Sequence, residues 1–167
     1  NSSTTSHRRN ELEKILRAEI TTLQFGFSQI EALDWLANED PAMLAFETTP
    51  SKIILERYAI VTLYYSLDGP KWEDQRDFLS EEPVCKWSIN NTAGTYFEGV
   101  GCNEDCFVVE TIASGMSNVT VLPPEIGFLN SLTLLSLGKS QKWTFRVIAI
   151  DIPVLILVVL SPYYLLQ

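Results

Sequence analysis

Apolar residues recur every three or four positions in three stretches of residues 1–67, and this spacing predicts three helices. The first helix is expected between Glu11 and the break at Gly26, with Glu13 and Arg17 forming an ion pair on its polar face. Residues 1–10 are polar and lack a period, so we expect them to form a disordered lead-in.

The second and third helices are expected to follow Gly26 in close succession. Ser28 and Glu31 have the spacing of a capping box, which predicts the start of the second helix. The third helix follows Pro50, which suits a first helical turn, and its apolar residues lie on most of its sides, so we expect it in the core. It ends at Asp68-Gly69-Pro70, where Gly69 is expected to adopt the left-handed conformation that ends many helices.

The pattern changes after residue 82. Residues 83–102 are rich in Pro, Asn and Gly and are interpreted as loop, whereas residues 107–109 predict a strand. Residues 129–137 have the leucine spacing of a leucine-rich repeat, in which the last leucines form a short strand. Counting back one repeat length from Leu135 gives Ile112 as the equivalent apolar position of an earlier repeat. The predicted repeat core comprises Leu122, Ile126, Leu129, Leu132, Leu135 and Leu137.

Four motifs of the sequence resemble motifs of known leucine-rich repeat proteins, and they follow one another in the same order as in that family. Cys85-Lys86-Trp87 and Gly99-Val100-Gly101-Cys102 resemble the C-x-W…G-V-x-C N-terminal cap of the plant-type class, and residues 122–129 (LPPEIGFL) resemble its L-P-x-E-I-G-x-L turn. Residues 32–40 (ALDWLANED) and 56–65 (ERYAIVTLYY) are similar to segments of the large leucine-rich repeat family of diatoms.

The resemblance implies an α/β fold in which a helical N-terminal cap precedes the first one to two turns of a leucine-rich repeat solenoid. The cap is expected over residues 11–106 and the incomplete repeats over residues 107–138. Such a cap covers the apolar end of the repeat stack. The implied function is non-enzymatic recognition of a protein or glycan ligand, outside the cell or at the cell surface.

The resemblance also implies a disulfide between Cys85 and Cys102, against the alternative of reduced, buried thiols. Cys106 is left over and is either free or competes for Cys85. The cysteine spacing and the single histidine lack a paired metal chelate, so we expect no metal and no cofactor.

Three sequons are candidate glycosylation sites in a secreted context, each of the form N-x-S/T. They begin at Asn1, Asn90 and Asn118.

Composition narrows the function classes further. The chain of 167 residues has 12 Lys and Arg against 21 Asp and Glu, and this acid excess argues against a nucleic-acid partner. The single histidine and the lack of known catalytic motifs argue against an enzyme. Asp34, Glu39 and Asp40 are interpreted as solvated surface acids rather than as a catalytic or calcium site. The tryptophans Trp35, Trp72 and Trp87 are interpreted as core residues and loop anchors rather than as a ligand-binding platform.

The hydrophobic tail, residues 139–167, differs from the rest of the chain. Residues 147–166 are long enough to cross a bilayer, although Asp151 and two prolines disfavour a comfortable span. Two interpretations stay open: the tail is a transmembrane segment of a membrane-tethered structural protein, or it replaces further repeats that truncation has removed.

Overall fold

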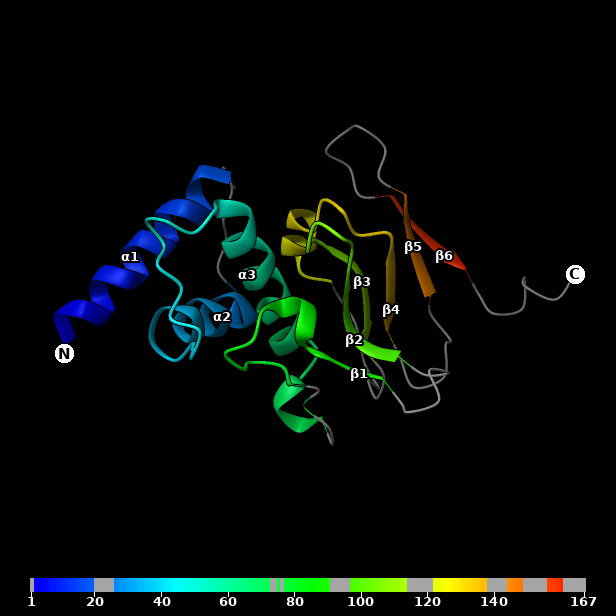
Figure 1. Cartoon of the computed structure of the whole chain (residues 1–167), viewed down its shortest axis with the longest axis horizontal. Helices are drawn as coiled ribbons and strands as arrows, with labels where there is room; N and C mark the ends of the chain where they lie inside the picture. Colours follow the sequence, from blue (N-terminus) through cyan, green and yellow to red (C-terminus); the bar gives the residue numbers. More distant parts are fainter. Residues whose placement is uncertain are drawn as a thin grey trace, which may run out of the picture.

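The helices lie at one end of the molecule and the sheet at the other (Figure 1). The computed structural model describes residues 2–19, 26–72, 75, 77–90, 97–113, 122–137, 144–148 and 156–160. The helices are α1 (Ser2–Glu19), α2 (Phe27–Asn38), α3 (Ser51–Ser66) and the short 3-10 helices η1 (Gly69–Lys71), η2 (Val84–Lys86) and η3 (Pro124–Phe128). The strands are β1 (Ser88–Asn90), β2 (Phe97–Cys102), β3 (Val108–Ala113), β4 (Leu134–Leu137), β5 (Thr144–Ile148) and β6 (Ile156–Leu160).

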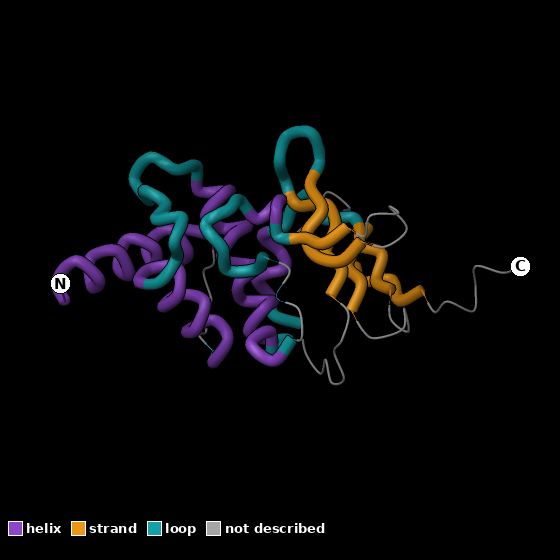
Figure 2. Tube along the Cα trace, turned by 60° about the horizontal axis from the view of Figure 1, so that its bottom comes forward, coloured by secondary structure: helices purple, strands orange, loops and turns teal. Residues whose placement is uncertain are grey.

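The helices α1, α2 and α3 stack in chain order, so that α3 lies between α2 and the sheet (Figure 1). Figure 2 shows the same separation of helices from strands in a second view. Residues 54–64 of α3 are all buried. The prediction that this helix lies in the core is therefore confirmed.

The N-terminal helix corrects the expectation of a disordered lead-in, because α1 already begins at Ser2. Two arginines of this region contact the rest of the helical part. Arg8 donates from Nε to the Ala37 carbonyl oxygen at 3.1 Å and lies over the Phe46 ring, and Arg9 pairs with Asp34. The predicted pair of Glu13 with Arg17 is present at 3.6 Å.

Two predicted helix ends are also corrected. The second helix begins at Phe27 with Gly26 as its N-cap and without a side-chain cap hydrogen bond, so the capping box predicted at Ser28 is wrong. At the end of α3 the left-handed residue is Asp68, with φ of 57°, and not Gly69. Gly69 is needed for space instead, because a Cβ atom there would lie 2.3 Å from the Tyr64 ring.

The sheet has the strand order β1-β2-β3-β4-β5-β6. Strands β1 and β2 fall within residues 83–102, so the interpretation of that segment as loop is wrong. The predicted strand at residues 107–109 is present and extends to Ala113 as β3. All neighbouring strands pair antiparallel except β3 and β4, which are parallel.

The register of β3 and β4 corrects the predicted equivalence of Ile112 and Leu135. Leu135 pairs with Thr111, so the interval between the paired residues is one position longer than the apolar pattern predicted, and Ile112 pairs with Ser136. The prediction failed because it required an apolar residue at the equivalent position. The chain instead buries Thr111, of which 1% is exposed.

Two of the strands, β5 and β6, belong to the predicted hydrophobic tail and pair with each other antiparallel. Among the described residues, we find no helix whose length and apolar character suffice to cross a bilayer. The membrane tether through residues 147–166 stays a prediction.

The helical part contains a buried ion pair that the sequence did not reveal. Arg57 of α3 donates from Nε to Oδ2 of Asp40 at 2.8 Å and from Nη2 to Oδ1 at 2.6 Å. Its remaining bonds reach the carbonyl oxygens of Glu82 and Ser80, at 2.9 and 2.8 Å. Asp40 is 1% exposed, so its interpretation as a solvated surface acid is wrong. Burial is tolerated because Arg57 and the Ala42 N–H, at 2.9 Å, satisfy both carboxylate oxygens.

Aromatic rings surround the same guanidinium. Its carbon lies 4.6 Å from the centroid of the Trp87 ring and 5.3 Å from that of Trp35, and these two rings meet edge to face. Cation–π attraction therefore adds to the hydrogen bonds. Both tryptophans are buried and Trp72 packs against the core, which confirms their interpretation as core residues.

We predict that Asp40→Ala lowers the free energy of unfolding by about 3–5 kcal/mol, because it leaves the Arg57 charge buried without its partner. Urea unfolding followed by tryptophan fluorescence measures this loss. The control is Lys71→Ala, which removes the exposed pair with Asp68 and is expected to cost less than about 1 kcal/mol. A loss at Asp40 as small as that at Lys71 would contradict the prediction.

A second prediction compares two glycines of 3-10 helices. Gly69→Ala places a methyl group inside the Tyr64 ring contact and is expected to destabilise the protein by about 1–3 kcal/mol. Gly127→Ala meets no atom within 4 Å and is expected to change stability by no more than about 1 kcal/mol. Thermal unfolding of both variants tests this, and equal effects would show that space at Gly69 is not limiting.

Candidate functional site

The candidate site is the junction between the helices and the sheet, where polar side chains cross from α2 and α3 to η3 and β3. We call it the helix–sheet junction and define it by Gln29, Glu56, Tyr58, Val108 and Glu125. Its residues come from four elements that are distant in the chain, so each contact fixes how the two ends of the molecule meet.

Gln29 and Glu125 form one contact across this junction. The Gln29 Nε2 atom of α2 donates to Oε2 of Glu125 in η3 at 3.0 Å, although 96 residues separate the two. Tyr58 of α3 donates from its hydroxyl to the Gln29 carbonyl oxygen at 3.4 Å. Burial, and after it the charge of Glu125, raises the pKa of Tyr58.

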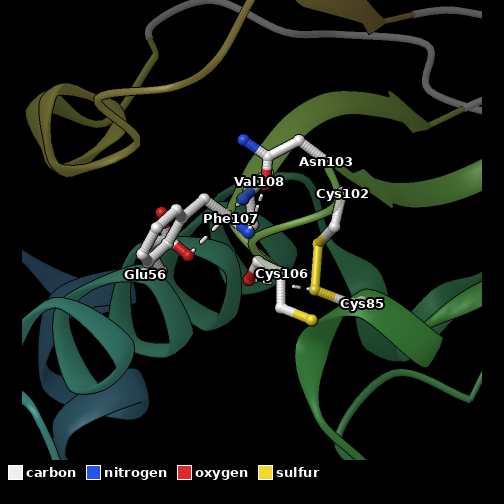
Figure 3. Close-up of a disulfide and its surroundings, with 7 residues drawn as sticks. All are labelled: Glu56, Cys85, Cys102, Asn103, Cys106, Phe107 and Val108. Carbon is white, nitrogen blue, oxygen red and sulfur yellow. Dashed lines mark hydrogen bonds between the residues drawn. A yellow bond between two sulfur atoms is a disulfide. The ribbon is translucent and has the colours of Figure 1, made fainter.

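Glu56 forms the second contact of the junction. Its side chain points from α3 toward the start of β3 (Figure 3), where Oε2 accepts the Val108 N–H at 3.5 Å. The Oε1 atom is buried without a hydrogen-bond partner among the described residues. Burial raises the pKa of Glu56, although the Val108 N–H and the nearby charge of Lys52 act in the opposite direction. A raised pKa means that the folded protein holds this proton more tightly than the unfolded chain.

The disulfide that the resemblance implied is present beside this contact. Cys85 is the second residue of η2 and Cys102 is the last residue of β2. Their Cα atoms are 5.5 Å apart. It therefore ties the segment that carries Trp87 to the hairpin of β2 and β3. Cys106 lies in the turn of that hairpin as an exposed, free cysteine, as one of the two alternatives expected.

The predicted repeat leucines are mostly buried at the junction. The core that they share with α3 contains Ile126, Leu129, Leu132 and Leu135, and Leu122 packs against it half-buried. Leu137 belongs to β4, but its side chain lies outside the described part of the structure.

The three candidate glycosylation sites stay predictions. Asn90 is the last residue of β1, the first strand of the sheet, and pairs with Phe97. Asn1 and Asn118 lie outside the described residues.

Sequence reasoning missed the polar members of the junction. Glu56 lies inside a helix whose apolar residues cover most sides, and an acid within such a helix is the signal that could have predicted a buried carboxylate. The sequence identified Glu125 only as the glutamate of the segment that resembles the L-P-x-E-I-G-x-L turn. Nothing local predicts that Gln29 donates to it, because that contact forms only after folding.

Among the described residues, no group of three or more His, Cys, Asp or Glu side chains is placed to hold a metal ion. Comparisons of the chain with protein-family models, with curated proteins and with solved structures find no match.

Proposed function

We propose that this chain is the start of a leucine-rich repeat recognition module, in which the helical part is the cap of the repeats and no step of catalysis is performed. The observation that carries the proposal is the parallel pairing of β3 with β4 in one constant register, from Glu110 with Leu134 to Ala113 with Leu137, with η3 in the connection. Leucine-rich repeats are about 20–29 residues long and place one strand per repeat side by side. The interval from Glu110 to Leu134 falls within that range.

The capping role is supported by the strand that pairs with the edge of β3 opposite β4. Strand β2 pairs with β3 antiparallel, so the hydrogen-bonding edge of the first parallel strand is not left open. Helix α3 packs against η3, so the apolar residues of the first repeat turn are covered as well. An uncapped repeat stack would expose both this edge and this apolar end to water.

The cap is expected to unfold together with the repeat. Glu125→Ala removes the acceptor of Gln29 and empties a buried site, which is expected to cost about 1–3 kcal/mol. Amide hydrogen exchange should then become about ten- to hundredfold faster in both α3 and β4, because the two belong to one cooperative unit. Glu47→Ala, at an exposed position, is the matched control and should leave exchange unchanged. Faster exchange confined to β4 would contradict a capping role.

The recognition role requires a ligand, and the proposed partners are a protein or a glycan surface. We expect the folded, labelled chain to bind a restricted set of oligosaccharides on an array of defined structures, with saturable binding that is lost when the disulfide is reduced and the chain unfolded. Binding that follows only the charge of the oligosaccharide, or that survives unfolding, would contradict glycan recognition.

A further inference from the structure

Three cysteines meet where the hairpin of β2 and β3 approaches η2 (Figure 3). Besides the disulfide of Cys85 with Cys102, the carbonyl oxygen of Cys106 lies 3.3 Å from the Cys85 sulfur. Cys106 therefore contacts the disulfide at Cys85. The Cys106 thiol is exposed, whereas the disulfide is half-buried.

The turn holds Cys106 in this place by its own hydrogen bonds. The Cys106 N–H donates to the Asn103 carbonyl oxygen at 3.0 Å, and the Phe107 N–H donates to the Asn103 side-chain oxygen at 2.9 Å. Cys106 has φ of 62°, a left-handed conformation that disfavours a residue with a Cβ atom. The turn therefore carries a conformational penalty that glycine would avoid, and it places the Cys106 carbonyl oxygen against the Cys85 sulfur.

We propose that Cys106 exchanges with the disulfide, so that the protein exists as two disulfide isomers. The Cys106 thiolate attacks the Cys85 sulfur, and the new bond between these two sulfurs forms as the bond from Cys85 to Cys102 breaks. The electron pair leaves on Cys102, which becomes the free thiol and takes up the proton that Cys106 lost. Thiol–disulfide exchange of this kind needs no external oxidant or reductant.

Attack on Cys85 rather than on Cys102 follows from the arrangement. The contact that places Cys106 at the disulfide is made with the Cys85 sulfur, which lies 3.3 Å from the Cys106 carbonyl oxygen. Attack on Cys102 would instead close a bond between two residues of the same turn.

The two isomers close loops of similar length. The sequence separation is 17 residues for Cys85 with Cys102 and 21 for Cys85 with Cys106. Loop-closure entropy depends only on the logarithm of this length, so it does not decide between them. Local packing decides, and the ladder of β2 and β3 already shifts register between Gly101 and Cys102, where the released residue would move. The exchange thus links the free thiol to the geometry of the hairpin that borders the helix–sheet junction.

The experiment uses the full chain under native conditions. Iodoacetamide traps whichever thiol is free over several hours, after which the protein is quenched in acid and digested with a protease that cleaves after glutamate. Glu98, Glu104 and Glu110 place the three cysteines on three different peptides, so each pairing is read directly by mass spectrometry without reduction.

The expected result is label on Cys102 as well as on Cys106, with labelled Cys102 at about 1–10% of the total label and matched by an equal amount of the peptide that links Cys85 to Cys106. The Cys106→Ser variant removes the attacking thiol and should show no label on Cys102. The Cys102→Ser variant should form the bond from Cys85 to Cys106 while keeping a cooperative unfolding transition.

Two results would overturn the proposal. One is label on Cys106 alone in the native protein, when the same protein scrambled in guanidinium chloride yields the peptide linking Cys85 to Cys106. The other is a folded Cys102→Ser variant in which Cys85 and Cys106 both remain free thiols.

Discussion

The helical part depends on the burial of one charged group, the Arg57 guanidinium. An arginine in the core is stable only when its donors are satisfied, because taking the charge out of water costs several kcal/mol. Here Asp40 supplies a carboxylate from the α2–α3 connection, and the segment before η2 supplies two carbonyl oxygens. The planar fork thus specifies where two irregular segments lie, which apolar packing alone would leave less defined.

The position of Trp87 follows from the same charge. Its ring stacks near Arg57 while its backbone carbonyl accepts the Val100 N–H of β2 at 2.9 Å. The disulfide begins two residues earlier, at Cys85. A chain of contacts therefore runs from the core of the helices, through one tryptophan, to the first hairpin of the sheet. Glu56 of α3 and Gln29 of α2 also join these two parts, by direct bonds to β3 and η3.

The features that the sequence predicted are those set by local spacing. Leu12 and Leu16 are buried because a helix returns to the core at a fixed interval. The regularly spaced Leu132 and Leu135 are buried as well. Features that need a distant partner were missed. The sequence around Asp40 predicts a surface acid, because its partner Arg57 is distant in the chain. Thr111 is polar, so it interrupts the apolar pattern from which the register of β3 with β4 could have been predicted. The disulfide could be predicted only from the resemblance to leucine-rich repeat proteins. The contact of Cys106 with it depends on the left-handed conformation of Cys106, which its residue type does not predict.

Strand β3 joins the antiparallel hairpin of β2 and β3 to the parallel pair of β3 and β4. On one side it pairs antiparallel with β2, in a hairpin closed by a short turn, and on the other it pairs parallel with β4, which requires a long connection through η3. The edge of β3 that faces away from β4 would otherwise leave its backbone groups unpaired. The hairpin solves this by supplying an antiparallel neighbour, and α3 covers the apolar turn that the connection brings back. The disulfide holds that hairpin to the helical part, so the residues that begin the parallel pairing are constrained by the helices that cover it.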